Sequence, residues 1–153
     1  YKFKEIYEFR EHYAKEWNLQ LLVYKNQEAI DKGIGPDKDK FECCTELKTN
    51  ALKKALDKNK FDALYLGIRR DEHGIRAKER VFSPRDSDFE WNYKEQPIEL
   101  WGQYKSKVKS ESHLRIHPLL GWTEPDIWQY IKRENIPTVS LYFSREGIFE
   151  SMN

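Results

Sequence analysis

The stretch FDALYLGIRRDEHGIRAKERVFSPRD, residues 61–86, sets the expected fold and holds the strongest functional signal in the chain. It begins with the short apolar run ALYL, residues 63–66, which predicts a buried strand. Gly67 ends this run, at a point where the backbone can turn tightly or let a ligand approach. A strand followed by a ligand-binding turn is therefore the first expectation.

Six basic and three acidic side chains follow between residues 69 and 85, in a chain whose net charge is only +1. Arginine binds phosphate and sulfate through planar, bidentate hydrogen bonds. Open α/β sheets bind ligands beyond the carboxyl ends of their strands. The charges alone leave a second interpretation open, a solvated surface loop with internal ion pairs. The basic residues are Arg69, Arg70, Arg76, Lys78, Arg80 and Arg85, and the acidic ones are Asp71, Glu72 and Glu79.

Size and composition indicate one soluble globular domain over residues 1–153, with 35% charged and 39% hydrophobic residues. No stretch approaches the roughly 20 apolar residues that cross a bilayer. The near-neutral charge gives no support to nucleic-acid binding. Cys43 and Cys44 are adjacent, so we expect no disulfide framework and a reducing cytoplasm. The first residues do not form a signal peptide, and the first residue is not a start methionine, so the chain is expected to begin within a longer protein.

Periodicity in the first part predicts alternating helices and strands. Apolar residues recur at helical spacing over residues 5–17, and a strand is expected over residues 19–24 (LQLLVY). A second helix is expected over residues 43–58, ahead of the strand at residues 63–66. The order helix, strand, helix, strand indicates an α/β fold with a largely parallel sheet.

The second part has a weaker pattern. Residues 87–112 form a long polar segment, which predicts a loop or lid, or a partner surface. A short strand is expected over residues 114–117, followed by a helix that Thr123 caps and that ends near Glu134. Residues 141–143 predict an apolar extended piece.

Several single residues allow two interpretations. The thiols of Cys43 and Cys44, at the start of a predicted helix, could be redox-active or half of an iron–sulfur site, or simply structural. Lys48 could face a phosphate or be an exposed helix lysine. His117, beside a proline at a strand end, could contact substrate or only close the strand. The four histidines lack metal-ligand spacing, so no metal site is expected.

Taken together, these segments resemble the small-subunit family of bacterial sulfate adenylyltransferases, within the 3′-phosphoadenylyl sulfate reductase (adenine nucleotide alpha-hydrolase-like) superfamily. The most specific match is GIRRDEHGIRAKERVFSPRD. The other matches are KFKEIYEFREHYAKEW with LQLLVYKN, then ELKTNALKKAL, and then RIHPLLGWTEPDIWQYIKRENIPTVSLYF. They follow one another in the order of the family and cover nearly the whole chain.

The resemblance implies a Rossmann-like parallel sheet flanked by helices, with strand order 3-2-1-4-5. The family's ATP-binding SGGKDS loop and its LDTG-like turn would precede Tyr1, so a partial domain lacking the first two strands is expected. If strands 3 and 4 keep their family places, about 14 Å separates them, three spacings of roughly 4.8 Å. Another segment or another chain would then fill the gap.

The resemblance also implies an activity, the transfer of adenylyl from ATP, with Mg²⁺, to sulfate. ATP, sulfate, a large GTPase subunit and further copies of the chain are the partners to consider. The chain alone is expected to be inactive. The alternatives are reduction of adenylyl or phosphoadenylyl sulfate, and a non-catalytic nucleotide-binding module. No iron–sulfur cluster is expected, because its further cysteine ligands are missing. The expected catalytic residues are Arg69, Arg70, Arg80 and Arg85, the nucleotide-binding ones are Gly67, Lys48, Arg76, Lys78 and His117, and the orienting ones are Asp71 and Glu72.

Overall fold

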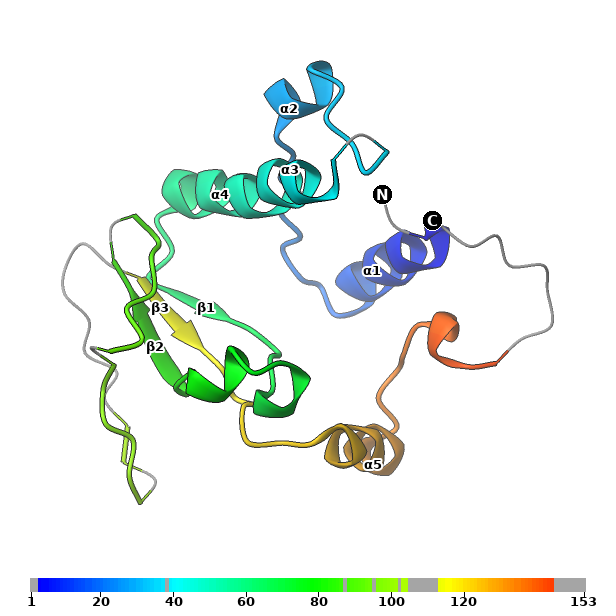
Figure 1. Cartoon of the computed structure of the whole chain (residues 1–153). Helices are drawn as coiled ribbons and strands as arrows, with labels where there is room; N and C mark the ends of the chain where they lie inside the picture. The colour runs from blue at the N-terminus through cyan, green and yellow to red at the C-terminus, as the bar shows by residue number, and fades with distance from the viewer. Residues whose placement is uncertain are drawn as a thin grey trace.

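The computed structural model describes residues 3–37, 39–86, 88–94, 96–101, 103–104 and 113–144, and Figure 1 shows their arrangement. A three-stranded sheet is joined to five helices. The helices are α1 (Lys4–Glu16), α2 (Gln27–Asp31), α3 (Lys40–Cys44), α4 (Ala51–Asn59) and α5 (Glu124–Glu134), and the strands are β1 (Ala63–Tyr65), β2 (Phe82–Arg85) and β3 (His113–Ile116). A π-helical turn (Thr45–Asn50) joins α3 to α4, and 3₁₀ turns lie at Arg70–Glu72, Arg76–Lys78 and Ser140–Tyr142.

The sheet has the order β1-β3-β2, and β3 is its central strand. β1 pairs with β3 in parallel, as expected for the fourth and fifth strands of the order above. β2 pairs with β3 in the antiparallel direction, so the sheet is mixed and not largely parallel. The α/β class is confirmed. The sequence missed β2 because Pro84 interrupts its pattern, and proline is tolerated here because β2 is an edge strand.

The pairing of β2 with β3 gives the sheet one polar and one apolar face. Side chains alternate between faces along a strand, and residues directly opposite each other share a face. Ser83 lies opposite Arg115, and Arg85 lies opposite His113, so these four polar side chains share one face. The apolar residues between them, Phe82, Pro84, Leu114 and Ile116, share the other.

β1 differs from the buried strand that the sequence predicted. It spans three residues, Ala63 is exposed and the Tyr65 side chain is 71% exposed. The prediction of burial was wrong because β1 has a neighbour on one side only. Its other edge meets no strand in the described part of the chain.

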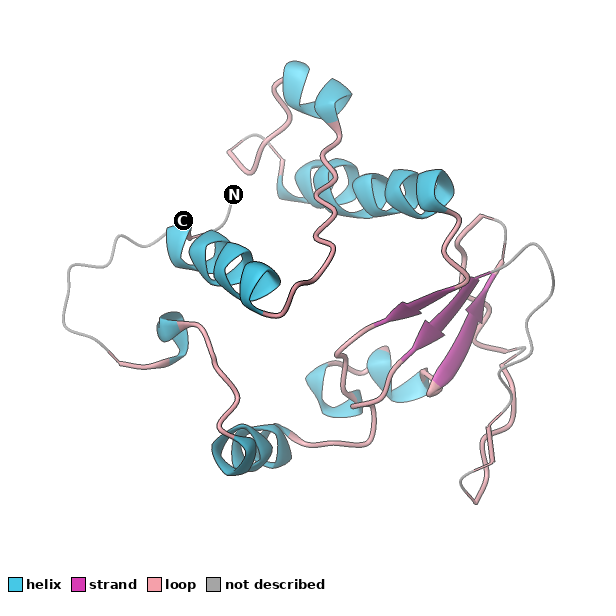
Figure 2. Cartoon of the chain, turned by 180° about the vertical axis from the view of Figure 1, so that it is seen from behind, coloured by secondary structure: helices cyan, strands magenta, loops and turns pink. Residues whose placement is uncertain are grey.

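Residues 19–24 also differ from the prediction, because they form no strand. They connect α1 to α2 as an irregular segment (Figure 2). Leu19, Leu22 and Val23 are 58%, 45% and 51% exposed. A strand forms only when its backbone groups pair with a neighbour, and no described strand lies beside this segment.

The helices follow the predicted pattern more closely. α1 matches the helix expected over residues 5–17. The second helical run begins at Lys40, earlier than expected, because the Asp39 carboxylate accepts a hydrogen bond of 2.7 Å from the Glu42 backbone N–H. Cys43 and Cys44 therefore lie inside the helical run and not at its start.

The helix predicted after residue 122 is confirmed as α5, and Thr123 caps its amino end as expected. The backbone N–H and the hydroxyl of Thr123 donate hydrogen bonds of 2.8 and 2.7 Å to the Asp126 carboxylate, which lowers the pKa of Asp126. Residues 141–143 were expected to be extended but belong mainly to the 3₁₀ turn Ser140–Tyr142, whose closing bond runs from the Phe143 N–H to the Ser140 carbonyl (3.1 Å).

The core is small for the length of the chain. The buried apolar residues include Ala29, Ala51, Leu56, Leu114 and Leu120, whereas α1 and α5 bury none. The accessible surface is 12622 Å², against about 8,200 Å² for a compact monomer of this mass. Much apolar surface is therefore uncovered. Among the described helices, none is both long and apolar enough to cross a membrane.

Candidate functional site

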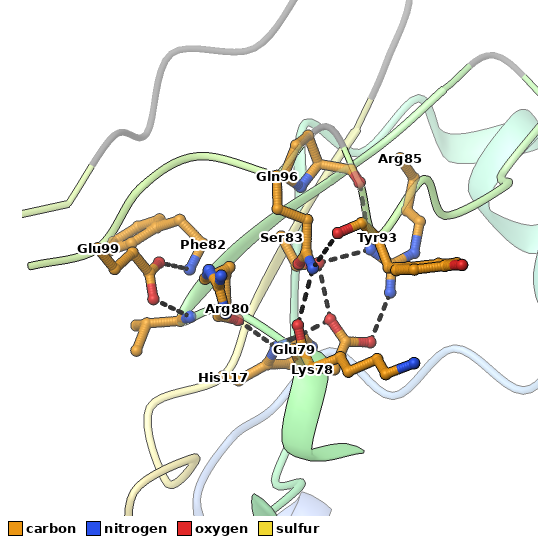
Figure 3. A network of polar contacts seen from close by, with 12 residues as sticks. Lys78, Glu79, Arg80, Phe82, Ser83, Arg85, Tyr93, Gln96, Glu99 and His117 are labelled. Carbon is orange, nitrogen blue, oxygen red and sulfur yellow. Dashed lines mark hydrogen bonds and ion pairs between the residues drawn. The ribbon is translucent and has the colours of Figure 1, made fainter. Parts of the chain in front are cut away.

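A buried ion pair lies at the centre of the polar face. The Glu79 side chain is 6% exposed and the Arg85 side chain 2%, and their atoms Oε1 and Nη2 are 2.8 Å apart (Figure 3). The Ser83 hydroxyl donates to the second carboxylate oxygen of Glu79 at 2.7 Å and accepts from Nη1 of Arg85 at 2.6 Å. The guanidinium group is thus fixed in one orientation by charge-assisted hydrogen bonds.

His117 lies beside this pair and is fully buried. Its Nδ1–H donates to the Arg80 carbonyl at 2.8 Å, which sets the tautomer and leaves Nε2 without a proton. Burial is the main cause that lowers the pKa of His117, so the ring is neutral at pH 7. Its Nε2 has no hydrogen-bond partner in the described residues.

The described part of residues 87–112 packs along β2. The Glu99 carboxylate accepts hydrogen bonds from the backbone N–H groups of Val81 and Phe82, each at 2.9 Å (Figure 3). The Gln96 side chain donates to the Lys78 carbonyl at 2.7 Å. Glu99 thus satisfies two backbone donors beside the β2 edge, and Gln96 satisfies one backbone acceptor. The interpretation as a lid stays a prediction, since several residues of the segment lie outside the described part.

A cavity of about 620 Å³ opens on the polar face. Its lining residues come from the β2–β3 pair, from the segment of 3₁₀ turns that follows β1 and from residues 89–91. Figures 1 and 2 show where that segment of 3₁₀ turns lies, next to the carboxyl ends of β1 and β3. Arg76, Arg85 and Arg115 supply positive charge, and the rings of Phe89 and Trp91 supply an apolar wall. The acidic residues along it are Glu72, Glu79 and Glu90.

Electrostatics in the cavity reflect several cations held close together. Burial, followed by the charges of Arg85 and Arg76, lowers the pKa of Arg115. Burial, followed by the charges of Arg115 and Arg85, lowers the pKa of His113. An arrangement that disfavours additional positive charge is suited to an anionic ligand.

The structure gathers some of the predicted residues and separates others. Glu72, Arg76 and Arg85 line the cavity, and His117 lies beside the Glu79–Arg85 pair. These four belong to one neighbourhood. Arg80 contacts His117 through its backbone carbonyl, whereas its side chain donates from Nε to the Pro97 carbonyl at 3.2 Å.

Arg69 is engaged in ion pairs next to that neighbourhood. Its guanidinium group lies 2.9 Å from the Asp71 carboxylate and 3.6 Å from that of Glu72. Asp71 also accepts a hydrogen bond of 3.1 Å from the backbone N–H of Glu124, in the first turn of α5. Both carboxylates thus pair with Arg69, and Asp71 also links the loop to α5.

Arg70, Lys78, Lys48 and Gly67 are among the predicted residues that do not line the cavity. Arg70 is exposed, and the Lys78 ammonium group lies 4.7 Å from the centroid of the Tyr93 ring. Lys48 is exposed in the π-helical turn. A Cβ on Gly67 would meet only the Leu119 side chain, at 3.9 Å, so no described atom requires glycine there.

The sequence interpretation missed four residues of this face, namely Ser83, Glu79, His113 and Arg115. A signal was present in the segment HLRIH, residues 113–117, where polar and apolar residues alternate as in a half-buried strand. The segment FSPR alternates in the same way. Reading both runs as strands with a polar inner face would have found Arg115.

No group of three or more histidine, cysteine, aspartate or glutamate side chains that could hold a metal ion occurs in the described ranges. Cys43 and Cys44 are free, half-buried thiols in α3.

Comparison with known proteins agrees with the resemblance. The chain is 52% identical over 145 residues to sulfate adenylyltransferase subunit 2 of Saccharophagus degradans, covering 94% of this chain and 48% of the relative. It is 51% identical over 147 residues to the protein of the same name from Parabacteroides distasonis, covering 95% and 49%. The chain spans about half the length of these relatives. The model of the phosphoadenosine phosphosulfate reductase domain matches residues 1–150, and the chain belongs to that family.

Proposed function

We propose that this chain, as part of a longer protein, contributes the oxyanion-binding side of an enzyme that transfers adenylyl from ATP to sulfate. The observation that supports this most is the set of three guanidinium groups, from Arg76, Arg85 and Arg115, around one cavity. The name of the relatives, sulfate adenylyltransferase subunit 2, supplies the reaction.

The proposed reaction makes one bond and breaks one. A sulfate oxygen attacks the α-phosphorus of ATP, the bond between the α-phosphorus and the bridging oxygen breaks, and pyrophosphate leaves. Such a transfer needs positioning and cations directed at the developing negative charge. A guanidinium group that other side chains hold in place, as Glu79 and Ser83 hold Arg85, supplies positive charge and loses little orientation when the ligand arrives.

We assign these roles as part of the proposal. Arg76 faces the cavity and binds the anion, while Arg85 is held in place by Glu79. Arg69 is oriented by Asp71 and Glu72. For the other predicted residues the proposal is the one made from sequence: Arg70 and Arg80 act on the phosphate or sulfate groups, and Gly67, Lys48, Lys78 and His117 bind the nucleotide.

Mg²⁺ would accompany ATP and neutralise phosphate charge. The described residues do not fit a site that holds the ion by protein ligands alone, since they offer no cluster of three suitable side chains. Mg²⁺ usually keeps several waters and binds through substrate phosphates. We therefore assign no step to it.

The proposal also covers further strands of the sheet, the partner subunit and the cellular compartment. We expect the first two strands of the family sheet to pair along the free edge of β1 and to cover Leu19, Leu21, Leu22 and Val23, which are apolar and exposed. A large GTPase subunit is the proposed partner, a homo-oligomer stays open, and the cytoplasm is the proposed compartment because both thiols are free.

The test uses the full-length protein with its GTPase subunit. Sulfate-dependent release of pyrophosphate from ATP is expected, and Arg76→Gln should lower the rate by roughly 10²- to 10³-fold, as removal of an oxyanion donor does. Release of sulfite with thioredoxin, or bound iron, would instead indicate a reductase. Absence of sulfate-dependent pyrophosphate release would overturn the proposal.

A further inference from the structure

Two residues that line the cavity each carry a buried donor atom that lacks an acceptor. Nε of Arg115 and Nε1 of Trp91 are buried, and neither has a hydrogen-bond partner in the described residues. Both groups can only donate. A buried donor without an acceptor costs free energy comparable to a lost hydrogen bond, so each is expected to meet a partner when the protein works.

Two guanidinium groups at the same cavity also lack a carboxylate. Neither Arg76 nor Arg115 forms an ion pair with a described residue. Both are half-buried, and both line the cavity. They approach it from different elements, Arg76 from the 3₁₀ turn Arg76–Lys78 and Arg115 from β3.

The acidic residues along the cavity are each engaged with another cation. Glu79 pairs with Arg85 at 2.8 Å, Glu72 lies 3.6 Å from Arg69, and Glu90 lies 3.9 Å from Lys53. The Glu79 charge also acts on Arg115, but neither Arg115 nor Arg76 has an ion-pair partner among the described residues, so both guanidinium groups can bind an anionic ligand.

From these contacts we infer that Arg115, Arg76 and the indole N–H of Trp91 together bind a tetrahedral oxyanion, while Arg85 holds the wall of the site through Glu79. An oxyanion only accepts hydrogen bonds, so it matches a set of groups that only donate. The inference rests on the proposed function for the identity of the ligand. That function offers two sources of the same chemistry, sulfate and the phosphates of ATP.

Two variants test the inference in the full-length protein with its partner subunit. Arg115→Gln removes the charge and keeps most of the side chain. Trp91→Phe removes the indole N–H but keeps an aromatic ring beside Arg85, whose guanidinium carbon lies 5.3 Å from the ring centroid. Lys132→Gln, on the exposed side of α5, is the matched control for loss of a positive charge.

Kinetics should separate the two sources of the anion. Arg115→Gln is expected to raise KM about 10- to 100-fold for one substrate, and Trp91→Phe about 3- to 10-fold for the same substrate, with the melting temperature unchanged. An effect on sulfate assigns the site to the acceptor, and an effect on ATP assigns it to the nucleotide. If the enzyme is active and both KM values stay within twofold of wild type in both variants, the inference is overturned while the proposed function stands.

A binding measurement gives a readout that does not depend on turnover. Inorganic sulfate, and ATP in a separate titration, should shift the indole N–H resonance of Trp91, which the Trp91→Phe spectrum identifies. The shift should saturate in wild type and be lost in Arg115→Gln. If this occurs without any adenylyl transfer, the inference is supported and the proposed function fails. An unmoved resonance with both ligands contradicts the inference.

Discussion

β1 and β3 are parallel neighbours in one sheet, yet one is exposed and the other is buried. Tyr65 in β1 is 71% exposed, whereas His113 and Leu114 in β3 are 6% and 7% exposed. The sequences suggest the opposite, because ALYL is more apolar than HLRI. The difference arises from position: β3 has a strand on each side and β1 has one only.

The comparison shows that neighbours decide the burial of a short strand more than its own composition does. It also shows where polar groups can be buried safely. The charged residues beside β3 are tolerated because Glu79 pairs with Arg85 and Ser83, not because they reach water. The apolar surface at β1, by contrast, is covered by no strand of the described chain.

The largest expected effect comes from breaking the buried ion pair. Glu79→Gln removes the negative charge and leaves Arg85 buried without a counter-ion, which should lower the free energy of unfolding by about 3–5 kcal/mol. Denaturant unfolding measures this. Glu8→Gln, in the exposed pair with Lys4, is the control and should leave the midpoint unchanged. Equal midpoints for the two variants would mean that the polar face is hydrated.

The next effect compares the two strands directly. Leu114→Ala in β3 opens a cavity in the core and should cost about 2–5 kcal/mol. Tyr65→Ala in β1 should cost about 0.5 kcal/mol or less in the 153-residue chain, because an exposed side chain loses few contacts. In the full-length protein the Tyr65→Ala cost should rise if added strands cover β1. An unchanged cost there would contradict the proposed covering strands.

The two edges of the sheet offer a third comparison. Glu99→Ala removes the acceptor for the backbone N–H groups of Val81 and Phe82 and should cost about 1–3 kcal/mol. Amide exchange at these two residues should accelerate, whereas exchange in β1 should not. If exchange at Val81 and Phe82 does not change, Glu99 does not protect the β2 edge.

The smallest effect concerns pH. Burial lowers the pKa of both His113 and His117, so below the ordinary value near 6.5 the unfolded state binds more protons than the folded state. The contribution of the two neutral histidines to the free energy of unfolding is fully present above pH 6.5. It is lost as the pH falls below 6.5, by at most about 1.4 kcal/mol per pH unit for each histidine. His113→Asn should reduce the slope between pH 5 and 6.5.

Local patterns allowed much of the fold to be predicted. α1 and α5 follow from helical periodicity, and the Thr123 cap follows from residue type. Residues 19–24 could not be assigned correctly, because a strand depends on a partner that local sequence does not specify. β2 was missed because its proline masks a short alternating pattern.

The candidate site was predicted only in part. Arginine content identified Arg76 and Arg85, but charge counting cannot tell an arginine that faces a cavity from Arg70, which is exposed. Arg115 was missed because it lies far along the chain and reaches the site only through the register that sets it opposite Ser83.

One measurement tests the account most directly, a crystal structure of the full-length protein with sulfate and a non-hydrolysable ATP analogue. The account predicts an oxyanion within hydrogen-bond distance of the guanidinium groups of Arg76 and Arg115, with the Glu79–Arg85 pair intact behind it. Anions bound elsewhere, with only water in the cavity over β2 and β3, would contradict it.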